Sequence, residues 1–204
     1  MRILNKIFGK SSSEQKFWEW FAKNSTRLYT AEGRTDDVCR ELEEEMHKVH
    51  KDLAYSFGPI KDERREFIVS ADGMLSVFPA VQRLADAAPD LPSWRITAFR
   101  PATGPSPIRV GSCSLRPSDI FFLAEAQDKK LNLTLFIKDL DRHDEQSLSS
   151  AVFLCLDAIL GEYDAQMKIG MVGWKPLPDG PSRDKLYRIE KLPEITHLLL
   201  DQTT

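Results

Sequence analysis

The stretch that most constrains the fold is residues 131–139, in which apolar and polar side chains alternate. Leu131, Leu133, Leu135 and Ile137 occupy every second position, which is the repeat of a β-strand with one aliphatic face. The segment before it is also rich in apolar and aromatic residues and predicts a partner strand. A helix and another strand are expected after it. The stretch therefore predicts the centre of a sheet, and nothing in it predicts a catalytic centre.

The composition is that of a folded protein with no general attraction to polyanions. The chain has 204 residues, of which 42% are hydrophobic and 29% are charged, a length that allows one large domain or two small ones. The formal net charge of −3 favours neither a nucleic-acid partner nor an anionic membrane. No apolar run forms a signal peptide or approaches the roughly 18 residues of a membrane span. Because the three cysteines are sparse and far apart, the expected address is the cytoplasm.

Residues 53–99 and 119–174 share the predicted order strand, strand, helix, strand. In each segment the helix would join two parallel strands by a right-handed crossover. Residues 100–118 are too short and too apolar for a linker between separate domains, so we expect a single α+β domain over residues 14–204. Its strands are expected to form one mixed, mostly antiparallel sheet with helices mainly on one face. Residues 1–13 are expected to be a flexible leader.

Two predicted helices carry unusually many apolar side chains. Over residues 14–24, the aromatic residues leave little room for a polar face, which indicates either a lid over the core or an exposed partner site. The helix expected from Asp144 to about residue 160 has a clear apolar stripe. Phe153 and Leu154 lie off that stripe, so this helix is expected to be buried on more than one side.

The sharpest candidate for metal chemistry is the group Glu43, His47 and His50. At about 100° per residue on a helix, the three side chains would lie within roughly 60° of one another, beside Cys39. Imidazole and carboxylate groups in such a position can share a metal ion. The spacing is not that of zinc peptidases, and the competing interpretation is a polar flank beside the apolar stripe of the helix.

Other catalytic patterns are weak or missing. The cysteines fall on apolar stripes or in a loop, no Gly-x-Ser-x-Gly is present, and no glycine-rich turn precedes a helix in the way that phosphate binding requires. Carboxylates gather after the key strand, where they indicate either a cation site or a solvated turn that caps the next helix. These residues are Asp139, Asp141, Asp144 and Glu145.

Arginines with aromatic neighbours form a further candidate surface. Arg95, Arg100 and Arg109 lie near Trp94 and Phe99 in the sequence. Since the net charge argues against nucleic acid, an acidic protein partner is the better functional interpretation of this group. Ordinary charges on the solvent face of a strand are the alternative.

Several short motifs resemble a family of uncharacterised bacterial cytoplasmic proteins, classed as a domain of unknown function. The motifs are Phe17-Trp-Glu-Trp-Phe, Leu53-Ala-Tyr-Ser-Phe-Gly-Pro, Phe78-Pro-Ala-Val, Trp94-Arg-Ile-Thr-Ala-Phe-Arg-Pro and Leu160-Gly-Glu-Tyr-Asp. The resemblance covers residues 14 to about 178. It implies a bacterial origin, a single α+β domain and a cytoplasmic address, and it transfers no catalytic residue.

The sequence favours a non-enzymatic protein-interaction module, of a regulatory or immunity type, that needs no cofactor. Its candidate partner-binding residues are Trp18, Trp20, Arg100 and Arg109. The alternative is a metal-binding protein or enzyme that uses Glu43, His47 and His50, and a small molecule bound between sheet and helix is a third hypothesis. The sequence leaves the oligomeric state open.

Overall fold

The computed structural model describes residues 11–31 and 36–201 and divides into two compact units, Met1–Ala98 and Phe99–Thr204. Helices and strands occur in both units, so the predicted α+β class is confirmed. The single domain expected from the sequence differs from this division: the chain passes from one unit to the next between adjacent residues. A search of the sequence for a long polar linker could not detect such a boundary. Of the predicted leader, residues 1–10 lie outside the described residues, and Ser13 already belongs to the first helix.

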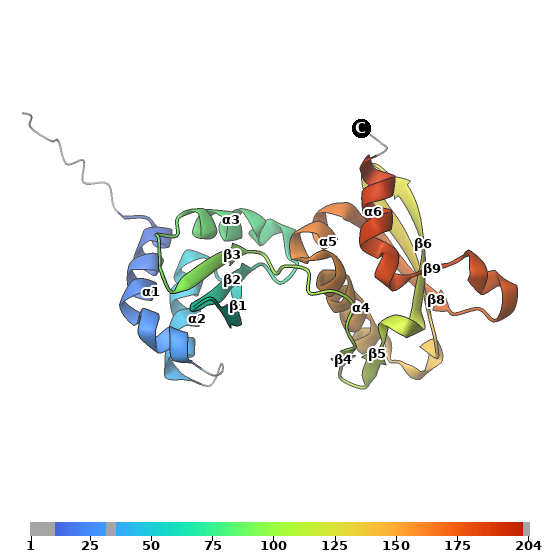
Figure 1. Cartoon of the computed structure of the whole chain (residues 1–204), viewed down its shortest axis with the longest axis horizontal. Helices are drawn as coiled ribbons and strands as arrows, with labels where there is room; N and C mark the ends of the chain where they lie inside the picture. Colours follow the sequence, from blue (N-terminus) through green and yellow to red (C-terminus); the bar gives the residue numbers. More distant parts are fainter. Residues whose placement is uncertain (1–10, 32–35, 202–204) are drawn as a thin grey trace, which may run out of the picture. The chain divides into compact units, whose positions relative to one another are not determined.

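The N-terminal unit combines three α-helices with a three-stranded sheet (Figure 1). Their bounds are α1 Ser13–Thr30, α2 Asp37–Val49, α3 Phe78–Asp86, β1 Ala54–Lys61, β2 Arg64–Ser70 and β3 Trp94–Ala98. β1 and β2 form an antiparallel hairpin, and β3 lies parallel to β2 after the chain has passed through α3. This unit thus contains the predicted order strand, strand, helix, strand.

Aromatic rings form the core of the N-terminal unit. Phe67 of β2 is fully buried at its centre, 4.9 Å from the ring of Phe21 on α1. The other rings that contact Phe67 are Phe17, Trp18, Tyr55, Phe57 and Trp94. The helix predicted over residues 14–24 extends further, to Thr30, because Leu28 continues its buried face. Of the two interpretations of this aromatic helix, the lid over the core is confirmed.

The C-terminal unit contains a four-stranded sheet in the order β8-β7-β6-β9 and a separate hairpin of β4 and β5. The bounds are β4 Ile108–Val110, β5 Cys113–Leu115, β6 Ile120–Gln127, β7 Lys130–Ile137, α4 Glu145–Leu160, α5 Glu162–Lys168, β8 Ile169–Pro176, β9 Tyr187–Arg188 and α6 Leu192–Asp201. β7 is antiparallel to β6 and parallel to β8, which follows α4 and α5. The predicted order strand, strand, helix, strand therefore occurs in this unit as well, with two helices, α4 and α5, before the last strand.

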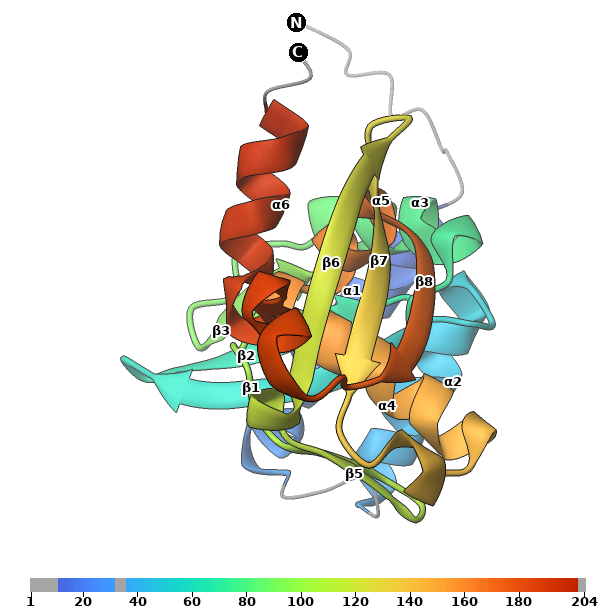
Figure 2. The ribbon, with the colours of Figure 1, turned by 90° about the vertical axis from the view of Figure 1, so that its right-hand side faces the viewer.

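Strand β7 is an inner strand of this sheet, as residues 131–139 predict. Its aliphatic side chains are buried and alternate with partly exposed ones. Leu148 of α4 and Ile195 of α6 belong to the same buried cluster as these side chains, so both helices pack on one face of the sheet. In Figure 2, β6, β7 and β8 lie in that order with α4 behind them.

The prediction of one continuous sheet was wrong. The strands of the described residues form three sheets, with the two strand-strand-helix-strand segments in different ones. The sequence shows that each segment forms a sheet, but hydrogen bonding between the segments depends on tertiary contacts that leave no periodic pattern. Within the described part of the chain, no helix has the length and apolar content needed to cross a bilayer.

Candidate functional site

The proposed metal ligands do not form a metal site. His47 is exposed on α2 and Glu43 is half-buried, but the helix ends at Val49 and His50 is extended. The Nδ1 atom of His50 accepts a hydrogen bond from the backbone N–H of Asp52 at 3.3 Å. No group of three His, Cys, Asp or Glu residues in the described ranges could hold a metal ion. The predicted spacing needed the helix to include His50, and the helix ends one residue before it.

The predicted partner-binding residues are not all surface residues. Trp18 is only 3% exposed, and its indole N–H donates to the carbonyl oxygen of Leu84 at 2.8 Å, so this tryptophan belongs to the core. Trp20 is half-buried on the same helix. Both belong to the N-terminal unit, whereas Arg100 and Arg109 belong to the C-terminal unit, so the four residues define no single described surface.

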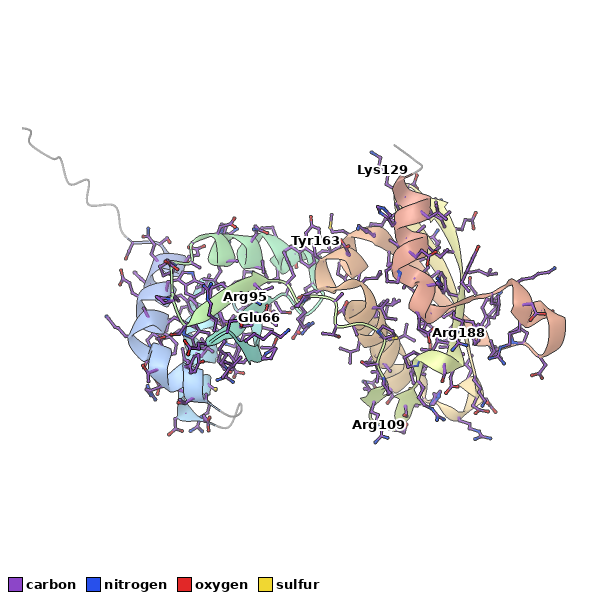
Figure 3. The ribbon with its side chains drawn as sticks, in the orientation of Figure 1. Glu66, Arg95, Arg109, Lys129, Tyr163 and Arg188 are labelled. Carbon is purple, nitrogen blue, oxygen red and sulfur yellow. The ribbon has the colours of Figure 1, made fainter. Side chains whose placement is uncertain are left out.

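The two arginines differ in their surroundings. Arg109 lies on β4 and is exposed (Figure 3). Arg100 is engaged inside its own unit, with its guanidinium 3.7 Å from a carboxylate oxygen of Asp157 and 4.0 Å from one of Glu162. Arg100 is therefore a structural residue of the C-terminal unit.

The cysteines are unsuited to nucleophilic chemistry. Cys39, Cys113 and Cys155 are all buried and free of disulfides. Burial raises the pKa of the Cys155 thiol to about 11, with a smaller contribution from the charge of Glu190. Since the thiolate is the nucleophile, a thiol in this position is inert at neutral pH.

The carboxylates before α4 form a capped turn. Asp144 is the N-cap of the helix, and its carboxylate accepts a bond from the Ser147 N–H at 2.8 Å and from the Ser112 hydroxyl at 2.7 Å. These hydrogen bonds lower the pKa of Asp144 to about 2, with the bond from the Ser147 N–H as the largest cause. The capped-turn interpretation is confirmed.

This cap predicts a pH dependence of the C-terminal unit. The folded pKa of Asp144 lies below its ordinary value of 3.8, so its contribution to stability is complete above about pH 4 and is lost as the pH falls towards 2. We expect the thermal midpoint of the wild type to fall more between pH 4 and 2 than that of Asp144→Asn, because asparagine also caps helices but does not titrate. Equal slopes for the two proteins would show that the cap carries no such linkage.

The candidate site is the outer edge of β8. Beyond the end of this strand, the Leu177 N–H donates to the carbonyl oxygen of Ile137 at 3.0 Å, and the register from Val172 to Pro176 is continuous. Backbone groups of successive strand residues point to opposite edges, so those of Val172 and Trp174 point away from β7. No other strand of the described chain pairs with this edge. The Val172 and Trp174 backbones therefore present donors and acceptors to an approaching strand.

Two hollows are lined by residues of α4 and β8, and together they are called the groove here. The first, here called the polar hollow, has a volume of about 450 Å³ and is lined by Glu145, Gln146, Ser149, Ser150 and Trp174. The second, here called the apolar hollow because most of its lining residues are apolar, has a volume of about 50 Å³ and is lined by Phe153, Leu156, Asp157, Ala165, Gln166, Ile169, Gly170 and Val172. The groove thus combines unpaired strand backbone with side-chain pockets on its helical wall.

Phe153 was expected to be buried, and it is not. It is 46% exposed and Leu154 is 45% exposed, whereas the residues of the main stripe of α4 are buried. The helix packs on the sheet through one face, so side chains off that stripe remain in solvent. The position of Phe153 off the stripe was the one sequence signal for this groove, because an exposed aromatic ring often marks a binding surface.

The sequence also predicted the strand that became β8, but it could not show that this strand lies at an edge. Comparison with known proteins gives no further guidance: no protein-family model, curated protein or solved structure matches the chain.

Proposed function

We propose that the protein is a non-enzymatic protein-interaction module whose C-terminal unit binds an extended segment of a partner by strand addition to β8. The observation that carries this proposal is the unpaired edge at Val172 and Trp174 beside the α4 groove. Strand addition draws affinity from main-chain hydrogen bonds and specificity from pockets for alternate side chains, and the groove offers both.

The edges of β1 and β9 are less suited to this role. β1 contains Pro59 and an irregular register between Phe57 and Ile60, features that block pairing at an edge. β9 has only two residues. β8 is eight residues long and carries a single charged side chain, Lys175, near its end. β8 also ends in a proline, Pro176, and its register shifts between Leu131 and Leu133 of β7, but residues 172–175 between these features are regular, so this part of the edge is open to an added strand.

The test is a selection of random linear peptides displayed on phage against the purified chain, followed by titration of a selected synthetic peptide. We expect Val172→Pro to weaken binding by about tenfold or more, because proline removes an edge-facing N–H and obstructs the incoming strand. The matched control is Val172→Ala, which keeps the N–H and should retain most of the affinity.

Chemical-shift changes on addition of the peptide should gather on β8 and the facing residues of α4. Peptides that bind Val172→Pro as tightly as the wild type would contradict the proposal. So would a chain whose β8 edge is already occupied by a second copy, which size-exclusion chromatography with light scattering would reveal.

A further inference from the structure

We propose that the segment bound at β8 carries a lysine or arginine for the polar hollow and a small apolar residue for the apolar hollow. This inference rests on the proposed function and adds the chemistry of the partner.

The groove is acidic. Among the described residues that line the two hollows, Glu145 and Asp157 carry charge, and both are carboxylates. Asp157 is already 3.7 Å from the guanidinium of Arg100, which reduces its attraction for a ligand. Glu145 is exposed, and no hydrogen bond or ion pair to it occurs in the described part of the chain. The carboxylate of Glu145 is therefore available to a cation.

The residues before and at the start of α4 are also mainly acidic. Four carboxylates lie within residues 138–146, against two cations, Lys138 and Arg142. Lys175 follows Trp174 on β8, but successive strand side chains point to opposite faces, so Lys175 projects away from α4. The end of the groove near the start of α4 therefore favours a positive group.

Trp174 supplies the second element of a cation site. It is half-buried in the wall of the polar hollow opposite the first turns of α4. An ammonium or guanidinium group is attracted to the face of an indole ring, and a nearby carboxylate adds a charge-assisted hydrogen bond. The hydroxyl groups of Ser149 and Ser150 offer further acceptors. A lysine or arginine side chain matches this combination of groups.

The apolar hollow fits a smaller side chain. Its apolar lining residues are Phe153, Leu156, Ala165, Ile169 and Val172, beside the polar Asp157 and Gln166, and its volume is about one-ninth of that of the polar hollow. Gly170 also lines it. A residue such as alanine or valine would bury its methyl groups there.

The spacing follows from the register of β8. The register is regular from Val172 onwards, Trp174 lies two residues beyond Val172, and a strand advances about 3.3 Å per residue. Side chains on one face of the added strand repeat every second residue. The basic and the small apolar residue should therefore be two positions apart in the partner segment.

The test repeats the selection from the random phage-displayed peptide library on the wild type, Glu145→Gln and Glu125→Gln. Glu125 is an exposed carboxylate on β6, outside both hollows, so it gives a matched change of net charge. We expect wild type and Glu125→Gln to enrich lysine or arginine at the stated spacing, and Glu145→Gln to lose that enrichment.

A selected peptide and its Lys→Gln form are then titrated against the three proteins. The Lys→Gln substitution in the peptide should weaken binding to the wild-type protein about fivefold to tenfold. It should weaken binding to the Glu145→Gln protein less than about twofold, because the charge of the peptide lysine contributes only when the Glu145 carboxylate is present. Phe153→Ala should weaken binding about threefold or more, whereas Leu154→Ala, equally exposed on the same helix but outside both hollows, should not.

The outcomes separate the two proposals. Peptides that bind at β8 with no preference for a basic residue would overturn this inference and leave the proposed function intact. Selection of acidic peptides that bind at β8 would also overturn the inference of a basic partner segment while leaving the proposed function intact. Failure to select any peptide that perturbs β8 would overturn both.

Discussion

Replacing Phe67 by alanine is expected to lower the free energy of unfolding of the N-terminal unit by about 3–5 kcal/mol, the usual cost of removing a large core aromatic side chain. Phe67 is fully buried, and its ring contacts aromatic residues from α1, β1 and β3. The substitution removes the common neighbour of these elements and leaves a cavity among rigid rings that cannot collapse easily. Among alanine substitutions in the N-terminal unit, we therefore expect the one at Phe67 to cause the largest loss of stability.

Tryptophan fluorescence during urea unfolding measures this effect, because Trp18, Trp20 and Trp94 all belong to the N-terminal unit. Ile60→Ala is the control: Ile60 lies on β1 in the same sheet but is 54% exposed, so its loss should cost less than about 1 kcal/mol. Similar unfolding midpoints for Phe67→Ala and Ile60→Ala would refute the central role of Phe67.

Replacing Glu162 by alanine is expected to destabilise the C-terminal unit by about 2–4 kcal/mol, since it leaves buried polar groups without their partner. Glu162 is fully buried at the start of α5, and its carboxylate accepts a bond from the Arg100 N–H at 3.0 Å. In return, the Glu162 N–H donates to the carbonyl oxygen of Arg100 at 2.9 Å. This residue therefore ties the first residues of the unit to the junction of α4 and α5.

Glu162→Gln separates the charge from the hydrogen bond. Glutamine keeps an acceptor oxygen of nearly the same shape, so it should lose only part of the stability that alanine loses. Urea unfolding followed by far-ultraviolet circular dichroism, and by fluorescence of Trp174 in proteins whose other three tryptophans are replaced by phenylalanine, measures the difference. If Glu162→Ala unfolds at the wild-type urea concentration, the reciprocal bonds with Arg100 contribute nothing to stability.

The same junction explains one motif that sequence reasoning could only describe. In Leu160-Gly-Glu-Tyr, Gly161 has a φ of +81°, and a Cβ at this position would lie 3.0 Å from the Ala102 backbone nitrogen. Glycine is needed because a larger residue would meet backbone atoms there in a strained conformation. The glycine and the following glutamate thus serve the packing of residues 100–104, which are distant in sequence.

Local patterns were sufficient to predict β7 and the start of α4 in the C-terminal unit. The alternation from Leu131 to Ile137 predicted β7 and its buried face, and the position of Asp144 before an apolar stripe predicted the cap of α4. Both depend on neighbours within a few residues, which the sequence displays directly. For the metal hypothesis the same local reasoning failed, because the end of α2 at Val49 removes His50 from the helix.

By itself, the sequence determined the α+β class, the two strand-strand-helix-strand segments and most of the core, because periodicity records which side chains must leave water. Tertiary structure alone decided that these segments lie in separate sheets, that Trp18 is a core residue and that β8 is an edge. An edge strand is one that lacks a hydrogen-bonded neighbour on one side. The alternation of side chains is the same in edge strands and inner strands, so the sequence does not distinguish them. The groove beside Val172 and Trp174 therefore became visible only when β8 was placed next to α4.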